Sequence, residues 1–351
     1  MSTHKLSSMI LVGAVVCYAV VAQAAPVTIA TVPVGNPGNA ADTVIPNPGY
    51  GKVDYNYRIG TYEVTNTEYT AFLNAVDAGG TNPNGIYNTS MGSDVRGGIT
   101  NTGPTGSKYA VKAGMGYMPV TYVSFWDACR FANWLHNGQG AVSTENGAYT
   151  LTTDGITNNT ITRNVHWKWA VASENEWYKG AYHQPVTQGG DADNYWLYPT
   201  ATNVEPYSDQ PPGSGAPDQT NTANFYKTNE TADGYDDGYA VTGSTSYVPP
   251  QNYLTNVGAY TQSDSFYGTF DQGGNVWEWN EAIIVGSSRG LRGGNWNIGS
   301  YYLAASYRSN GTPTNEVSLI GFRVASVPEP GSLILIVSGA IVALILWRRR
   351  K

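Results

Sequence analysis

Thiols and imidazoles are the side chains that most often perform redox or metal chemistry, and this chain has few of them. The 351 residues include two cysteines, Cys17 and Cys129, and four histidines. Cys129 falls within an apolar helical pattern, where a cysteine usually packs as a small hydrophobic residue. The histidines are far apart, and no two have the spacing of zinc ligands. The sequence therefore yields no recognisable set of nucleophile, base and orienting group.

Charged side chains have a second possible use, in buried ion pairs. Arg292 and Arg323 are the candidates, and we expect Glu174, Glu176 or Glu278 to be their partners. A catalytic role for Arg292 is the alternative.

The overall charge excludes one class of partner. The chain has 19 basic and 26 acidic residues, and five of the basic ones lie at its two ends. An acidic surface without a basic patch repels nucleic acid and favours cations. We therefore expect no nucleic-acid binding.

Three capped helices must position these side chains. Thr65 with Glu68, Ser124 with Asp127 and Ser173 with Glu176 each have the spacing of a capping box. Amphipathic patterns follow all three, including Tyr69, Phe72, Leu73 and Val76 after the first cap.

Strands are expected near 57–63, 276–279 and 321–325. In the second of these, Trp277 and Trp279 alternate with Val276 and Glu278, so we expect one face to be buried and the other presented. The Gly273-Gly274 and Gly293-Gly294 pairs permit positive φ or close backbone approach. Residues 79–116 and 185–265 look like loops, and a loop as long as the second is uncommon unless something holds it. The pattern indicates an irregular, loop-rich α+β domain with few regular elements.

Both ends of the chain have the pattern of targeting signals, which are called the two predicted addresses below. Residues 1–24 combine Lys5, an apolar run and Ala22-Gln23-Ala24, which is typical of a secretory signal peptide. Residues 25–54 form an extended lead-in to a domain predicted over 55–326. In residues 327–351, Pro328-Glu329-Pro330 precedes an apolar stretch and four basic residues. This tail resembles the PEP-CTERM sorting signal, with a transmembrane helix and a membrane transpeptidase as its implied partner; an ordinary tail anchor is the alternative.

The domain itself resembles the formylglycine-generating enzyme, or sulfatase-modifying factor, family. The most diagnostic segment is the hexapeptide Gly274-Asn275-Val276-Trp277-Glu278-Trp279. The other matching segments occur in the family's order, at residues 58–66, 119–135, 173–177, 292–296 and 321–324. The resemblance implies a variant of the C-type-lectin fold.

The enzymes of this family hold copper(I) with two cysteines five residues apart, because soft thiolates select that ion. Here the resemblance places Ile298 and Leu303 at those positions. Neither side chain binds copper, so we expect no copper and a dry, apolar end of a surface cleft.

Calcium is the cofactor that the resemblance does imply, in a structural role. One site would use the side chains of Asp271 and Glu278 with the carbonyls of Gly274 and Val276. The second would use Asn224, the Phe225 carbonyl, Asp237 and the Tyr239 carbonyl. In the second site, Asp233-Gly234-Tyr235 offers a competing register, and solvated acidic loops are the alternative for both.

Two functions follow. The first is an exported, non-catalytic, calcium-stabilised binding or structural module at the surface of a bacterium, anchored in the membrane or released. Its ligand would be an envelope or extracellular polysaccharide or a protein. The second is a formylglycine-generating-type oxidase, or another enzyme in the same cleft, with unrecognised ligands.

Overall fold

The computed structural model describes most of the chain between the two predicted addresses. The described residues are 26–43, 49–211, 220–229, 231, 234–284 and 286–327. The predicted signal peptide and the predicted transmembrane helix lie outside them. Within the described ranges, no helix has the length and apolar character needed to cross a membrane.

The three longer helices begin where the capping boxes predict. Helix α1 spans Asn66–Val76, α3 spans Phe125–His136 and α5 spans Glu174–Tyr182. In each, the cap hydroxyl accepts from the third backbone amide, and the carboxylate there accepts from the cap backbone. These reciprocal bonds satisfy donors that a helix start otherwise leaves open. The caps therefore fix the starting residue of all three helices.

Two four-stranded sheets form the centre of the fold. The first has the order β1-β2-β14-β5 and the second β12-β11-β10-β13. The strands of the first sheet are β1 (Thr31–Val34), β2 (Tyr57–Gly60), β14 (Val324–Ser326) and β5 (Trp169–Val171). Those of the second are β12 (Ser309–Gly311), β11 (Ser288–Arg292), β10 (Trp277–Ile284) and β13 (Ile320–Phe322). Only Arg323 separates β13 from β14, so one residue joins the sheets.

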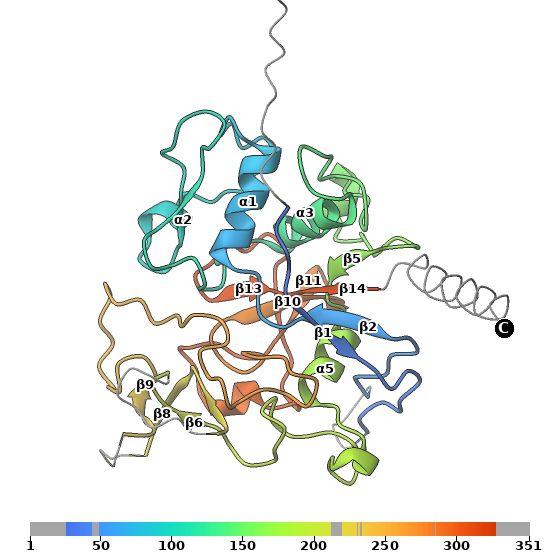
Figure 1. The fold of residues 1–351 in the computed structure, drawn as a ribbon, viewed down its shortest axis with the longest axis vertical. Coiled ribbons are helices and arrows are strands. Elements are labelled where there is room, and N and C mark those ends of the chain that lie inside the picture. The colour runs from blue at the N-terminus through green and yellow to red at the C-terminus, as the bar shows by residue number, and fades with distance from the viewer. Residues whose placement is uncertain are drawn as a thin grey trace, which may run out of the picture.

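The helices cover opposite sides of this centre (Figure 1). α1 and α3 lie on one side, where Phe72 and Phe131 pack with Trp279 and Phe322 in the largest apolar cluster. α5 lies on the other side, where Trp177 packs in a second cluster. Helices on both faces bury the Glu278–Asn280 part of β10.

This double cover overturns one expectation. We expected the strand around Trp277 to present one face, but Glu278 and Trp279 are both fully buried and Trp277 is half-buried. The sequence alternation is real, but Glu278 is polar because it meets a buried arginine rather than water. Burial of a charged residue is uncommon unless it is paired, so alternation alone was misleading.

The loop-like regions contain only short elements. Residues 79–116 hold α2 (Ser90–Ser93), β3 (Ile99–Thr100) and β4 (Ala110–Val111), and α4 (Thr153–Thr157) precedes β5. The later region holds η1 (Val186–Gln188), β6 (Tyr207–Ser208), β7 (Thr222–Ala223), β8 (Tyr226–Thr228) and β9 (Asp237–Tyr239), and η2 (Ser300–Leu303) precedes β12. The glycine pairs act as expected: at Gly274 φ is +87°, and a Cβ there would lie 2.3 Å from the Asn224 carbonyl oxygen. Together these observations confirm an irregular α+β fold.

The C-terminal end of α5 contains a buried histidine. His183 is 2% exposed, its Nδ1 lies 2.8 Å from the Tyr267 hydroxyl, and its ring stacks on that tyrosine. Burial, followed by the nearby Lys179 charge, lowers the pKa of His183 from 6.5 to about 4. The folded state therefore holds His183 neutral at a pH where the unfolded chain takes up a proton.

We predict that His183 makes the protein less stable in mild acid. Its folded pKa is depressed, so its contribution is complete above pH 6.5 and is lost as the pH falls toward 4. Between pH 7 and pH 5 the loss of unfolding free energy from this residue should be about 2 kcal/mol. His183→Gln, which cannot titrate, should flatten the dependence of the urea midpoint on pH over this range. Equal slopes in both proteins would contradict the prediction.

Candidate functional site

A buried guanidinium lies where the two sheets meet. Arg323 is fully buried, and its Nε and Nη2 donate to the two carboxylate oxygens of Glu278 on β10, at 2.6 and 2.7 Å. It also donates to the carbonyls of Gly60 at the end of β2 and of Phe270. The Trp177 indole of α5 donates to Glu278 as well, at 2.9 Å. The Arg323 side chain thus connects the two sheets, and the Trp177 indole connects α5 to β10 through Glu278.

Two further carboxylates face this ion pair. Burial first, and then repulsion from Asp271 and Glu278, raises the pKa of Glu63 well above its ordinary value. Burial is also the largest cause that raises the pKa of Asp271, to about 6, with Glu278 adding to it. The Oε2 atom of Glu63 is buried and has no hydrogen-bond partner. One guanidinium does not neutralise three carboxyl groups when all are ionised, and either protonation or a bound cation relieves the excess of negative charge.

This cluster contains the first predicted calcium site. Asp271 and Glu278 belong to it, together with the Gly274 and Val276 carbonyls at the start of β10. Both Glu278 oxygens already accept from Arg323 or Trp177, whereas Asp271 accepts one bond, from the Gly258 amide. Asp271 also lines a small cavity of about 10 Å³, which is about the volume that one water molecule requires. Among the described residues, no group of three acidic, histidine or cysteine side chains is placed to hold a metal ion, and Asp271 is the less occupied of the two predicted carboxylates.

The second predicted calcium site lies around β8 and β9. There the Phe225 carbonyl accepts from the Ser208 hydroxyl and from the Ala240 amide. The Tyr239 carbonyl accepts from two backbone amides. The Asn224 side-chain amide donates to the Tyr253 carbonyl, and Asp237 accepts from the Gly234 amide. A metal ion would have to replace several of these bonds, and the site stays a prediction.

The positions that the resemblance gave to copper cysteines are apolar. Leu303, at the end of η2, is fully buried with Tyr198, Phe225 and two alanines. Ile298 is half-buried, and its carbonyl accepts from the Tyr226 amide. Leu303 fills the space beside Gly273 and Gly294, where a Cβ at Gly294 would lie 2.7 Å from it. We expected an apolar cleft end here, but Leu303 packs into the interior.

The remaining cysteine is also inaccessible. Cys129 lies on the buried face of α3 and is fully buried. Burial raises the pKa of its thiol well above the ordinary value. A thiolate is the nucleophilic and metal-binding form, so Cys129 has no path to either role.

The second predicted arginine pair joins the start of α5 to β11. Arg292 lies 2.8 Å from Glu174, and Arg308 binds the same carboxylate at 2.6 Å. The Tyr50 ring lies against both guanidinium groups, with centroid distances of 4.5 and 5.4 Å. Arg292 is fully buried, so the structural interpretation of this residue is the better one.

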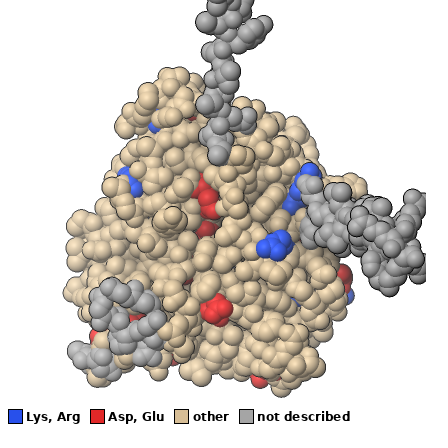
Figure 2. All heavy atoms as spheres, in the orientation of Figure 1, with Lys and Arg blue, Asp and Glu red and all other residues tan. Residues whose placement is uncertain are grey.

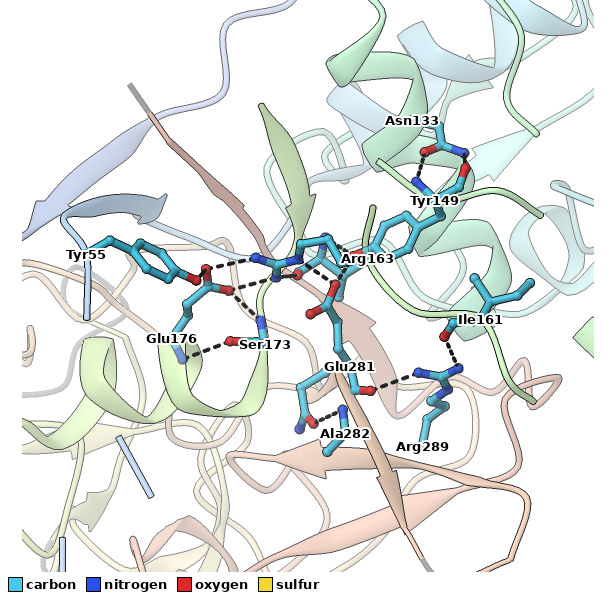
Figure 3. Close-up of polar contacts among 12 residues, drawn as sticks. Tyr55, Asn133, Tyr149, Ile161, Arg163, Ser173, Glu176, Glu281, Ala282 and Arg289 are labelled. Carbon is cyan, nitrogen blue, oxygen red and sulfur yellow. Dashed lines mark hydrogen bonds and ion pairs between the residues drawn. The ribbon is translucent and has the colours of Figure 1, made fainter. Parts of the chain in front are cut away.

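A third arginine links α5 to β10 (Figure 3). Arg163 pairs with Glu176 at 2.8 Å and with Glu281 at 2.7 Å, and lies between the two carboxylates in the figure. The Tyr149 hydroxyl donates to Glu281, and the Tyr55 hydroxyl to Glu176. These contacts fix the orientation of Glu281, which is 16% exposed and is one of the few accessible members of the network.

An open groove of about 340 Å³ lies between these two arginine networks. It is lined by Gly49, Tyr50, Ser173, Glu174, Asn175, Glu281, Ala282 and Arg308. The N-terminal turn of α5 forms one wall and the bulged part of β10 another. Regular elements therefore form two walls of the groove, and its lining is both polar and apolar.

Sequence reasoning missed this groove. Glu174 was named only as an ion-pair partner, and Tyr50, Asn175, Glu281 and Arg308 were not singled out. They come from four separate segments, with no local spacing that connects them. Only tertiary contacts place the segments together, such as the Arg308–Glu174 ion pair and the hydrogen bond from the Gly51 amide to Asn175.

Charged side chains are sparse on the outside of the protein. Figure 2 shows one face on which most of the described surface is uncharged. Charged residues make up 13% of the chain, and eight of them form the ion pairs described above. A partner of this face meets mainly neutral side chains.

Sequence comparison gives two matches. The profile of the sulfatase-modifying factor enzyme 1-like domain matches residues 50–327. The profile of the PEP-CTERM protein-sorting motif matches residues 326–351. Among proteins of curated function, none matches the chain in sequence.

Similarity to the solved structure of CarF supports the fold described above. The crystal structure of CarF is similar with a TM-score of 0.52 and 20% identity, over 86% of this chain and 99% of that chain. PvdO from Pseudomonas aeruginosa gives 0.44 at 17% identity, covering 86% and 92%. Treponema denticola variable protein 1 gives 0.43 at 20% identity, covering 85% and 95%.

We predict that losing the Arg323 guanidinium lowers the free energy of unfolding more than losing the charge of the Glu278 carboxylate. Arg323→Met leaves the fully buried Glu278 without its ion-pair partner and should cost about 3–5 kcal/mol of unfolding free energy. Glu278→Gln leaves Arg323 facing two carboxylates and should cost less. Lys52→Met, which breaks an exposed pair at 3.7 Å, should change little. Chemical denaturation measures all three, and a larger cost for Glu278→Gln than for Arg323→Met would contradict this account.

Proposed function

The chain belongs to the sulfatase-modifying factor enzyme 1-like family and ends in a PEP-CTERM sorting motif, and from this we propose that it is a non-catalytic binding module of that family. The sorting motif indicates export and association with the membrane or surface of a bacterium, through the sorting machinery that reads such tails. The finer proposal concerns what the domain does there: it holds a polysaccharide or protein ligand rather than oxidising a substrate.

The observation that carries the proposal is the state of the thiols. The family's enzymes need a thiolate pair for copper, and Leu303 at one of those positions is buried among apolar side chains. The only cysteine beyond the predicted signal peptide is Cys129, which is fully buried on α3. A fully buried thiol with a raised pKa neither binds copper(I) nor attacks a substrate. The oxidase chemistry therefore lacks both the thiolates that would bind copper(I) and an accessible thiol that could act as nucleophile.

Calcium is the second part of the proposal. The surplus of carboxyl groups around Arg323 supports a bound cation. The Oε2 atom of Glu63, which has no hydrogen-bond partner, is a further oxygen that could bind the cation. We assign the ion to Asp271 with the Gly274 and Val276 carbonyls; Glu278 contributes charge while it holds Arg323. Bound calcium would supply structural stability by neutralising this buried charge.

We predict that the purified protein neither binds copper(I) nor consumes oxygen with a Cys-x-Pro-x-Arg peptide. Changing both Ile298→Cys and Leu303→Cys should create copper(I) affinity, because soft sulfur ligands select that ion. The matched pair Ile298→Ser with Leu303→Ser should not, since it offers only hydroxyls. A chromophoric copper(I) competition assay gives the affinity. Turnover of the peptide by the unaltered protein would restore the enzyme as the function.

We also predict that calcium stabilises the folded domain. Excess chelator should lower the melting temperature, since a ligand at a hundred times its Kd contributes about 2.7 kcal/mol. Asp271→Asn should remove most of this response, whereas Asp264→Asn, an exposed carboxylate in the same loop region, should retain it. Differential scanning calorimetry with and without chelator tests both. Identical melting curves for the unaltered protein would rule out the calcium assignment.

A further inference from the structure

The groove at the start of α5 presents donors and acceptors together. Glu281 uses its Oε1 atom for Tyr149 and Arg163, and none of the described residues donates to its Oε2. Asn175 is exposed; its Oδ1 accepts from the Gly51 amide, while none of the described residues accepts from its side-chain NH₂. The groove therefore offers a carboxylate acceptor and an amide donor to a ligand.

Two more side chains complete the lining. Arg308 binds Glu174 through Nε and Nη2 and is 31% exposed, so part of its guanidinium faces solvent. The half-buried Tyr50 ring adds an aromatic wall. Planar polar groups beside an aromatic face suit a ligand that has both hydroxyls and C–H surfaces.

The charges around the groove cancel. Three guanidinium groups, those of Arg163, Arg292 and Arg308, pair with three carboxylates, those of Glu174, Glu176 and Glu281. An anionic or cationic ligand would find no excess of opposite charge and would disturb these pairs. The balance favours a ligand without net charge.

The lining is also held in place before a ligand arrives. Figure 3 shows Glu281 fixed from β10 against Arg163, which Glu176 of α5 holds on its other side. Arg308 is fixed by Glu174, which Arg292 holds from the interior. Side chains locked by a second layer of contacts lose little entropy on binding.

From these four observations we infer that the groove is a binding site for a neutral saccharide. A sugar hydroxyl both donates and accepts, so it satisfies Glu281 Oε2 and the Asn175 amide at once. The volume of about 340 Å³ is at the small end for ligand pockets, which suits roughly one or two sugar residues of a longer chain. This inference rests on the proposed binding function and names its ligand class and site.

The test titrates purified full-length protein with neutral trisaccharides, namely maltotriose, cellotriose, mannotriose and galactotriose, and with anionic trigalacturonic acid. Saturation-transfer NMR detects binding and calorimetry measures it. At least one neutral trisaccharide should bind, and Glu281→Gln and Asn175→Ala should each weaken it by about tenfold or more. Asp154→Asn, an exposed carboxylate change on α4, should leave the affinity unchanged.

Asn175 is exposed, so its variant keeps the test valid if Glu281→Gln fails to fold. Absence of binding by all four neutral trisaccharides, preference for trigalacturonic acid, or binding that both groove variants leave unchanged would each overturn the inference. The copper and oxygen assays on the same preparation distinguish failure of the proposed non-catalytic function from failure of the groove as a saccharide site. Peptide turnover would refute the non-catalytic function, whereas silent assays without saccharide binding would refute only the groove.

Discussion

The fold depends on how one buried guanidinium is neutralised. Arg323 stands between the last strands of the two sheets, and its donors reach Glu278 on β10 and the backbone at the end of β2. An arginine in the interior is costly unless every donor is matched, so the sheets must meet at one distance and angle. The Trp177 indole binds the same carboxylate and sets α5 against β10. The position of α5 then determines where the groove lies.

The residues of this charged centre are different from those at the two positions where the resemblance places copper cysteines. The ion pairs and capping boxes that hold the domain together do not involve Ile298 or Leu303, although Leu303 packs beside Gly273 and Gly294. The apolar side chain of Leu303 is accommodated within this frame, where it fills the space beside Gly294. A family fold therefore does not by itself carry the family reaction. The same frame leaves the α5 groove free to serve another ligand.

The sequence foretold the parts of the fold that have local causes. The capping boxes at Thr65, Ser124 and Ser173 predicted three helix starts, because each is completed within four residues. The arginine pairs were predicted as alternatives, and only the tertiary structure selected Glu174 for Arg292 and Glu278 for Arg323. The second face of β10 was misjudged, since the cover by α5 is a long-range contact.

The candidate groove was beyond sequence reasoning for the same reason. Its side chains come from the lead-in, α5, β10 and the segment before β12, and no spacing along the chain relates Tyr50 to Glu281 or Arg308. Polar residues are mostly exposed in any protein, so nothing in the sequence distinguished these from their neighbours. These side chains are recognised as a possible binding site only when the structure shows the ion pairs that bring them together.

The most direct test of the central claim is the metal content of the protein isolated from its own bacterium without added metal. Elemental mass spectrometry of the purified, unreconstituted protein reports every bound metal at once. This account predicts calcium and no stoichiometric copper, because the carboxylates around Arg323 attract a hard cation and the thiolate pair is absent. Stoichiometric copper would contradict the account, since it would require ligands that a buried Cys129 and the apolar Leu303 do not supply.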